Sequence, residues 1–404
     1  MQKIITIALL CATIIACNSS GGNKVQQSAD LSNISLTVCE ARPADSIKTY
    51  NDSLSFDYYD LGKLDADTLL AFQYPLLNLS LLDTNGNFLR EISRKGRLLE
   101  NFQGSFITSQ WDKQNNLYLL EEGNNFSIAV FDNALKFRYR VNLVKSLPDN
   151  FVFPLSTSFH LVEEDGGVKR IYMSSGDIRY NVFSEEYYTK ANSLISFRLD
   201  STSVSEVKHH LPFNTFDAVK SGISGDSRAW NTPVVFFDMN NDKGFLKYKF
   251  DDNIYICGRD ALSIEQVIPL KLQWGKDRAY TTSFGNARKT QFESAKEQLL
   301  LQYANINYNG IKVAGNKAYV LYTKPIPQSE VPDNPNQTSQ MDISPVLHIV
   351  DLEDPSKQYS VEFSPKYNAR EFSVDQKGNV FLSSNPMKEE NSYIYKFTID
   401  FHGK

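Results

Sequence analysis

The chain has few of the residues on which metal sites, disulfide frameworks and nucleic-acid binding depend. It contains five histidines and four cysteines in 404 residues, and no closely spaced cysteine pair. A zinc site is therefore not expected. Cys39 and Cys257, beyond the N-terminal region, either form one disulfide or lie buried separately, and we favour the second. The 42 lysines and arginines against 47 acidic residues form no basic stripe, so we expect no nucleic-acid partner.

The sequence also lacks the common signatures of catalysis. The string Gly222–Gly225 is one residue short of a Gly-x-Ser-x-Gly elbow, and neither a phosphate-binding loop nor a dinucleotide fingerprint occurs. His209 and His210 are adjacent and face opposite sides of a regular strand, so they do not chelate one ion together. We interpret three acidic doublets as solvated turns: Glu121-Glu122, Glu163-Glu164 and Glu185-Glu186. We therefore predict no catalytic residue and no cofactor.

One acidic string, Asp238–Gly244, is similar to a calcium-binding loop in its alternating oxygen ligands. Such a loop needs glycine at its sixth position, where this chain has Lys243, and no glutamate closes it. A tight turn between two strands, Val234–Met239 and Phe245–Phe250, explains the string more simply. We therefore predict a hairpin here and no metal site.

The N-terminus has the layout of a secretory signal followed by a lipid-attachment site. Lys3 precedes an apolar run from Ile4 to Ala16, which is shorter than the roughly 20 residues of a membrane-spanning helix. The run ends in Ile14-Ile15-Ala16-Cys17, which resembles the lipobox of bacterial lipoproteins. That resemblance implies removal of residues 1–16, acylation of Cys17 and attachment to a membrane. An ordinary signal peptide with an incidental cysteine is the alternative.

The segment after Cys17 predicts a tether and a cellular location. Residues 17–33 are rich in serine, asparagine, glutamine and glycine, as in flexible linkers, and precede a single folded domain at 34–404. In lipoproteins, aspartate directly after the cysteine is associated with inner-membrane retention, and a nearby acidic cluster with surface export. This chain has Asn18 and no acid before Asp30. The resemblance therefore implies an outer-membrane lipoprotein that faces the periplasm.

A recurring unit shows how the rest of the chain is organised. Aromatic residues make up 12% of the chain and favour β-structure. In each unit a strand ends at a tight turn of Asp, Asn or Gly, residues that tolerate the backbone angles of hairpin turns, and an alternating strand follows. The units lie at Leu79–Ile92, Trp111–Leu119, Asp251–Ile256, Val313–Val320 and Val374–Leu382. The sequence therefore predicts successive antiparallel hairpins.

Units spaced by roughly 60 residues suit the blades of a β-propeller better than the turns of a solenoid. We predict an all-β, six-bladed propeller of four-stranded antiparallel blades, and the uneven spacing leaves five or seven blades open. Ile34–Val38 is expected to supply the strand that closes the ring beside the last blade. The chain resembles the six-bladed, TolB-like or NHL-like propeller lipoproteins of the Bacteroidota in its lipobox and in Leu82–Ile92 and Trp111–Phe131.

Two insertions interrupt the β pattern. Apolar residues at helical spacing predict one short amphipathic helix within residues 287–305. The segment Pro325–Pro345 is polar and contains several prolines, which predicts an exposed loop.

The best candidate for ligand contact is the loop Lys220–Asn231. Two glycines make it flexible, and Arg228 and Trp230 offer a charged fork and a stacking plane. Tyr180–Tyr188 is a second aromatic-rich insertion. The alternative is that these large aromatic residues only hold their loops against the body.

These observations favour a non-catalytic binding or scaffolding protein of the cell envelope. Its partners would be the membrane, through the lipid, and a protein or small ligand on a propeller face. The alternative is a propeller hydrolase or lactonase with carboxylates, with or without a metal, in the central channel. Residues of different blades converge in such a channel, so a search for local motifs misses them.

Overall fold

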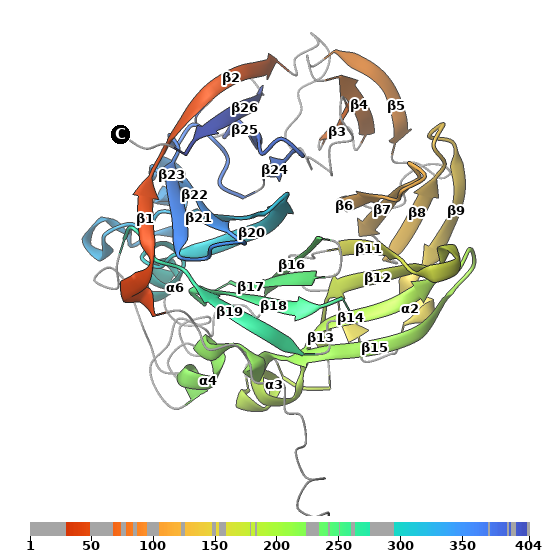
Figure 1. Ribbon diagram of the computed structural model, residues 1–404, viewed down its shortest axis with the longest axis horizontal. Coiled ribbons are helices and arrows are strands. Elements are labelled where there is room, and N and C mark those ends of the chain that lie inside the picture. The colour runs from red at the N-terminus through yellow and green to blue at the C-terminus, as the bar shows by residue number, and fades with distance from the viewer. Residues whose placement is uncertain are drawn as a thin grey trace, which may run out of the picture.

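A computed structural model describes residues 30–48, 68–73, 78–83, 87–94, 105–122, 126–147, 151–152, 159–177, 179–181, 184–223, 234–240, 243–249, 251–259, 263–274, 295–370, 372–385, 388 and 393–401. These residues form antiparallel sheets set radially around a central axis, with few helices (Figure 1). The fold is an all-β propeller. Within these ranges, no helix is long and apolar enough to cross a membrane.

Five blades have four or more strands among the described residues. The first contains β6 (Ser105–Trp111), β7 (Leu117–Glu122), β8 (Ser127–Phe131) and β9 (Phe137–Asn142). The second contains β11 (Phe159–Glu163), β12 (Lys169–Ser174), β14 (Asn192–Leu199) and β15 (Val204–Pro212), and a small pair, β10 (Phe151–Val152) with β13 (Gly176–Asp177), forms a separate sheet. The third contains β16 (Val235–Asn240), β17 (Lys243–Tyr248), β18 (Asn253–Gly258) and β19 (Ile264–Pro269).

The last two of these blades involve both ends of the chain. The fourth contains β20 (Asn307–Ala314), β21 (Lys317–Thr323), β22 (Pro345–Asp351) and β23 (Lys357–Glu362), joined by β1 (Ser35–Val38). The fifth, the terminal blade, contains β24 (Ser373–Val374), β25 (Val380–Ser383) and β26 (Tyr393–Asp400), joined by β2 (Glu40–Lys48).

One further sheet has three strands, β3 (Thr68–Gln73), β4 (Asn78–Asp83) and β5 (Phe88–Arg94). It lies in the ring between the terminal blade and the β6–β9 blade (Figure 1). The expectation of six four-stranded blades is therefore corrected, because the described residues form five. The repeat in the sequence marks hairpins rather than complete four-stranded blades. The hairpin at Leu79–Ile92 pairs with only one more described strand.

Strands from both ends of the chain close the ring. β2 pairs antiparallel with β26, from Glu40 opposite Asp400 to Lys48 opposite Tyr393. β1 instead pairs parallel with β23, at the outer edge of the preceding blade. The shared terminal blade agrees with the expectation, but the closing strand is β2 rather than Ile34–Val38.

The recurring Asp/Asn turn has one chemical cause. The Asp112 carboxylate accepts hydrogen bonds from the backbone N–H groups of Gln114 at 2.9 Å and Asn116 at 2.8 Å, and from the Asn116 side-chain amide at 2.8 Å. The carboxylate–asparagine bonds recur in the turns Asp83–Asn87 and Asp375–Asn379. Because the side chain satisfies amides that the turn leaves unpaired, these residues specify the hairpin locally. The predicted hairpins at these positions are confirmed.

The hydrophobic core lies between neighbouring blades. One cluster contains Phe245 of the third blade together with Val320 of the fourth, both almost fully buried. Cys39 belongs to a cluster at the terminal blade and Cys257 to a cluster around β16–β18, and both are free thiols. The interpretation of two separately buried cysteines is therefore confirmed.

The helices among the described residues are short, and all but the first 3₁₀-helix, which precedes β1, lie in connections between strands. They are α2 (Leu143–Ser146), α3 (Glu185–Lys190), α4 (Asp217–Ile223) and α6 (Ala295–Tyr303), with 3₁₀-helices η2 (Leu31–Asn33), η3 (Asp165–Gly167), η4 (Phe213–Thr215), η6 (Gln328–Glu330) and η7 (Pro335–Gln340).

The predicted helix at 287–305 is confirmed as α6 over its C-terminal part, whereas residues 275–294 lie outside the described ones. Leu299 of α6 packs with Val331, which is 2% exposed. Val331 lies in the second predicted insertion, so this insertion is anchored by α6 rather than simply exposed.

Ion pairs correct the interpretation of two acidic doublets as solvated turns. The side chain of Glu121 is 1% exposed and accepts hydrogen bonds from Arg140 at 3.0 and 3.1 Å. The residues of the second doublet form ion pairs with their neighbours in β12, Glu163 with Lys169 and Glu164 with Arg170. The third doublet is exposed, as predicted, in the first turn of α3.

Acid is expected to destabilise the fold through His348 of β22, which is fully buried. Burial, together with the charge of Lys247, lowers the pKa of His348 to about 4 from its ordinary 6.5, although Nε2 contacts the Gln358 side chain at 2.8 Å. The folded state therefore disfavours protonation. The contribution of His348 to the unfolding free energy is fully present above about pH 6.5. It is lost as the pH drops towards 4, with a total loss of about 3 kcal/mol.

Urea unfolding at a series of pH values measures this loss. The His348→Gln variant should show a flatter dependence of unfolding free energy on pH across this window, whatever its stability at neutral pH. Equal slopes in the variant and the parent would contradict the assignment to His348.

Candidate functional site

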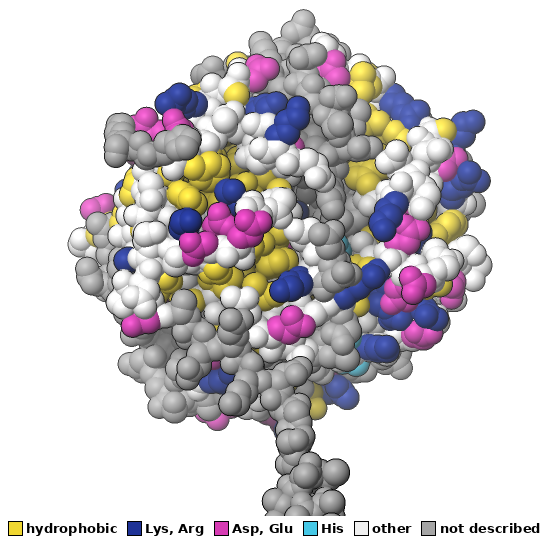
Figure 2. All heavy atoms as spheres, viewed as in Figure 1, with side chains coloured by type: hydrophobic (Ala, Val, Ile, Leu, Met, Phe, Trp, Pro, Cys, Tyr) yellow, Lys and Arg dark blue, Asp and Glu magenta, His cyan; other side chains and the backbone are white. Residues whose placement is uncertain are grey.

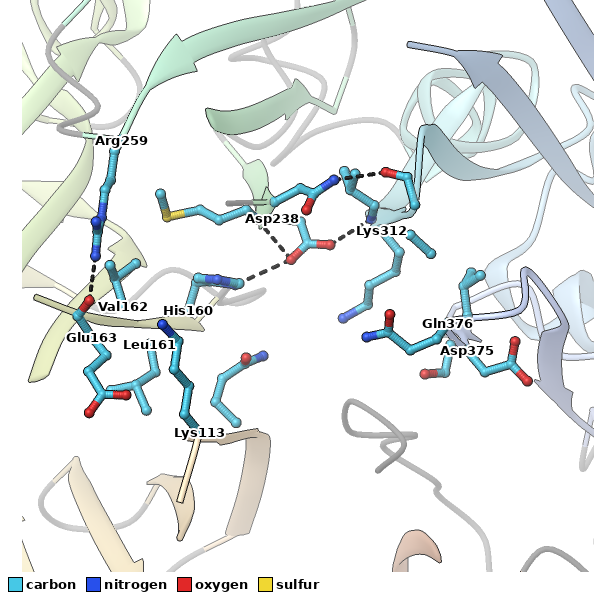
Figure 3. A pocket seen from close by; sticks show the side chains of 18 residues that line it. Lys113, His160, Leu161, Val162, Glu163, Asp238, Arg259, Lys312, Asp375 and Gln376 are labelled. Carbon is cyan, nitrogen blue, oxygen red and sulfur yellow. Dashed lines mark hydrogen bonds and ion pairs between the residues drawn. The ribbon is translucent and has the colours of Figure 1, made fainter. Parts of the chain in front are cut away.

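A cavity of about 660 Å³ lies at the centre of the ring, and we call it the central cavity. Its walls come from the innermost strands β6, β11, β16, β20 and β24, from residues that follow them, and from Arg259 after β18. The lining side chains include Lys113, His160, Asp238, Arg259, Lys312 and Gln376 (Figure 3). Because each of these strands belongs to a different blade, the propeller collects residues from distant parts of the chain around one space.

Asp238 and His160 form a polar pair in the wall of this cavity. Asp238 Oδ1 lies 3.2 Å from His160 Nδ1 and accepts a hydrogen bond from the N–H of Met239 at 2.9 Å. Its Oδ2 accepts a hydrogen bond from the N–H of Val313 at 2.7 Å. Burial raises the pKa of Asp238, but hydrogen bonding from His160 and the charge of Lys312 outweigh it, so the pKa lies below its ordinary value. Asp238 is therefore an ionised carboxylate that joins β11, β16 and β20.

Two lysines extend into the central cavity from opposite walls, Lys113 from the β6–β7 turn and Lys312 from β20 (Figure 3). None of the described carboxylates forms an ion pair with either ammonium group, whereas the lining carboxylates have partners. Glu163 bonds to Lys169 at 2.9 Å and to Gln114 at 3.1 Å. The two lysines therefore offer charge that the wall does not neutralise by direct contact.

A second cavity of about 420 Å³ lies beside the β11–β15 blade, and Arg259 lines both cavities. Ser196 Oγ and His210 Nε2 lie 2.7 Å apart in its wall, and both side chains are almost fully buried. Its other charged residues include Arg170 and Glu164, which bond to each other at 2.5 Å. Charged residues of this wall pair with one another, so the central cavity is the stronger candidate for a ligand.

The structure does not test the residues predicted to contact a ligand. Arg228 and Trp230, like the predicted lipid-attachment residue Cys17, lie outside the described residues. In the second aromatic insertion, Tyr187 is 5% exposed and stacks on Phe213 with ring centroids 5.5 Å apart. There the alternative is confirmed, because the aromatic residues hold the connection against the body.

The structure also shows where the residues considered as metal ligands lie. Asp238–Gly244 forms the predicted hairpin, with Asn240 opposite Lys243 across the turn. His209 is exposed and His210 is buried, so the two imidazoles face opposite sides of β15. Among the described residues, no group of three or more His, Cys, Asp and Glu side chains is placed to hold a metal ion.

Sequence reasoning missed the central cavity residues as a group. The sequence indicates a hairpin turn at Asp238 and nothing at His160, because 77 residues stand between them in the chain. Lys113 lies inside one of the recurring turns, which predicted structure rather than ligand binding. The usable signal was the position of each residue at the inner edge of its blade, which becomes visible only once the ring is known.

The comparisons with known proteins support the fold. The chain matches no protein-family model and no curated protein. Among solved structures, it is similar to a Bacteroides vulgatus protein described as a member of the duf4221 family, with a TM-score of 0.63 and 14% identity over 90% of this chain and 99% of that one. It is also similar to a Bacteroides fragilis protein described as exported, with a TM-score of 0.50 and 11% identity over 90% and 96% of the two chains.

A Xanthomonas campestris protein described as a gluconolactonase has a TM-score of 0.44 and 9% identity over 93% of this chain and 99% of that one. That TM-score supports no statement about this chain. At identities this low, the two Bacteroides structures show a common fold and nothing about ligand or reaction.

Proposed function

We propose that this chain is a ligand-binding propeller of the cell envelope that takes a small polar molecule into the central cavity. The observation that carries the proposal is the convergence of five innermost strands on one cavity of about 660 Å³ with polar and charged walls. Ligand sites of proteins are commonly clefts of roughly 300–1,000 Å³ with a few convergent polar groups. The fold supplies a rigid frame, so such a site needs no rearrangement to be formed.

We further propose that the chain is a lipoprotein anchored through Cys17 and facing the periplasm from the outer membrane. The lipobox, the neutral residues after Cys17 and the structural likeness to an exported Bacteroides protein support this. A Cys17→Ser variant should move from the membrane to the soluble fraction on fractionation, and retention in the membrane would contradict the anchor.

A protein partner on a propeller face is a separate part of the proposal. Figure 2 shows hydrophobic side chains gathered over the region of β20–β24, among charged ones. Cross-linking on intact membranes, with the lipid anchor present, tests for such a partner. Recovery of the same cross-linked species from a soluble form lacking residues 1–29 would show that the partner binds the propeller itself rather than the anchor.

A pair of variants in one turn tests ligand binding in the central cavity. Gln376 lines the cavity and is exposed, whereas its neighbour Lys377 is exposed without lining it. A tryptophan at position 376 should obstruct the cavity, and one at 377 should not. In a thermal-shift screen of sugars, amino acids and organic acids, a ligand should raise the melting temperature of the parent and Lys377→Trp but not of Gln376→Trp. Equal stabilisation of all three, or none by any compound, would contradict the proposal.

The Asp238–His160 pair supports a second candidate, a hydrolase in which His160 is the general base. A carboxylate beside Nδ1 orients an imidazole so that Nε2 is left to take a proton. The same screen separates the two candidates when bound compounds are followed by NMR. Conversion of a compound that stops in a His160→Asn variant would favour the hydrolase, and binding without conversion would favour the binding protein.

A further inference from the structure

We propose that the ligand of the central cavity is an anionic carbohydrate whose acid group binds to one of the two cavity lysines, Lys113 or Lys312. This inference rests on the proposed function, because it names the class of ligand for the same cavity. It is carried by the placement of the two lysines and by the chemistry of the groups beside them.

Two ammonium groups that no described carboxylate contacts favour an anionic group beside them. Lys113 is exposed and Lys312 half-buried, and both extend into the cavity (Figure 3). The nearby carboxylate of Asp238 is occupied by His160 and by two backbone N–H groups. The carboxylate of Asp375 accepts backbone hydrogen bonds within its own turn, at 2.8 and 2.9 Å. Ammonium groups without a contacting carboxylate bind anionic oxygens through charge-assisted hydrogen bonds.

The neutral groups of the wall favour hydroxyl groups on the same ligand. Gln110 is 8% exposed and Gln376 is exposed, and both side-chain amides line the cavity. An amide both donates and accepts, so it matches a sugar hydroxyl, which does the same. The third amide, Asn240, donates to the carbonyl of Gly315 at 2.8 Å and is therefore part of the wall. Amides and a histidine around two lysines suit a hydroxyl-rich acid better than an apolar one.

Isothermal titration calorimetry with D-glucuronate, D-glucose 6-phosphate and D-glucose tests the inference. At least one of the two anionic sugars should bind, and glucose should bind at least about tenfold more weakly, as expected for losing a charged hydrogen bond. The two acids separate a carboxylate from a phosphate as the preferred group. Added salt should weaken binding of the acid and leave that of glucose nearly unchanged.

Lysine variants locate the binding. At least one of Lys113→Met and Lys312→Met should weaken binding of the acid by about tenfold or more, whereas the control Lys377→Met, in the β24–β25 turn next to Gln376, should not. Melting temperatures of the three variants confirm that they fold. Equal affinity for acid and glucose, or unchanged affinity in both lysine variants, would overturn the inference. If the inference is overturned in this way but binding is still lost in Gln376→Trp, the proposed function survives. If none of the three sugars binds at millimolar concentration, this inference fails. The broader thermal-shift screen then tests the proposed function.

Discussion

A chain that begins at residue 49 is expected to lose the cooperative unfolding of the propeller. Its terminal blade would lack β2, and β26 would present an unpaired edge from Tyr393 to Asp400. The cluster at that blade would also lose Cys39 and Ala41, which pack with Phe397. The expected loss is comparable with the roughly 5–15 kcal/mol that keeps a whole domain folded. Differential scanning calorimetry measures it as a lost or strongly broadened transition.

Two controls separate ring closure from a general effect of truncation. A chain that begins at residue 30 keeps β1 and β2 and should melt at the same temperature as the full chain. A synthetic peptide of residues 30–48, added to the shorter chain, should restore the transition because it supplies the missing strands. A cooperative transition at the parent temperature in the chain that begins at residue 49 would show that β2 does not hold the ring closed.

Replacing Glu121 with alanine is expected to cost about 3–5 kcal/mol of unfolding free energy, because it removes one partner of a buried ion pair and leaves the charge of the other buried without that carboxylate. Arg140 is 10% exposed and donates to both carboxylate oxygens of Glu121, and Ser127 donates to the same carboxylate at 3.1 Å. These bonds join β7, β8 and β9. Urea unfolding of the purified variant measures the loss.

Matched variants show whether burial is the cause. Arg138, also on β9, is 63% exposed and pairs with Asp132 at 3.0 Å, so Arg138→Ala should cost no more than about 1 kcal/mol. Replacing both buried partners, as in Glu121→Leu with Arg140→Met, should recover much of the loss because neither charge of the pair remains buried. A cost for Glu121→Ala as small as that for Arg138→Ala would contradict the argument.

The hairpins were predictable because their causes are local. Asp112 and Asn116 are four residues apart, and the same two residues that mark the turn in the sequence form its hydrogen bonds. Strands such as Ser127–Phe131 are buried on both faces, and their side chains join the cores on the two sides of the blade in alternation. Because short-range patterns of this kind predict the propeller fold, the architecture was predictable without any similar sequence.

The closing strand was missed because its cause is not local. β2 contains Pro43, Asp45 and Lys48, does not alternate, and has no apolar stripe. It is a strand because β26 offers an open edge, and a shift in register between Pro43 and Asp45 accommodates the proline. Ile34–Val38 looked more like a strand, and it is one, but it pairs with a different blade.

The candidate site was missed for a related reason. Lys113 and Lys312 are separated by 198 intervening residues, and no spacing in the chain relates them. Their place in one cavity depends on the order of blades around the axis and on which strand of each blade is innermost. Pattern reasoning predicts the type of strands and their turns, but not the arrangement of blades that brings two particular side chains to the same cavity.

The pairing of β2 with β26 also determines when, during synthesis of the chain, the ring can close. Arg42 contacts Asp400 across 358 positions of the sequence, so the first described strands are made long before their partner exists. A chain that leaves the ribosome, or crosses a membrane, from its N-terminus must carry β2 unpaired until Tyr393–Asp400 has followed. The ring therefore cannot close before β26 has been made, and the edge of β2 stays exposed until then.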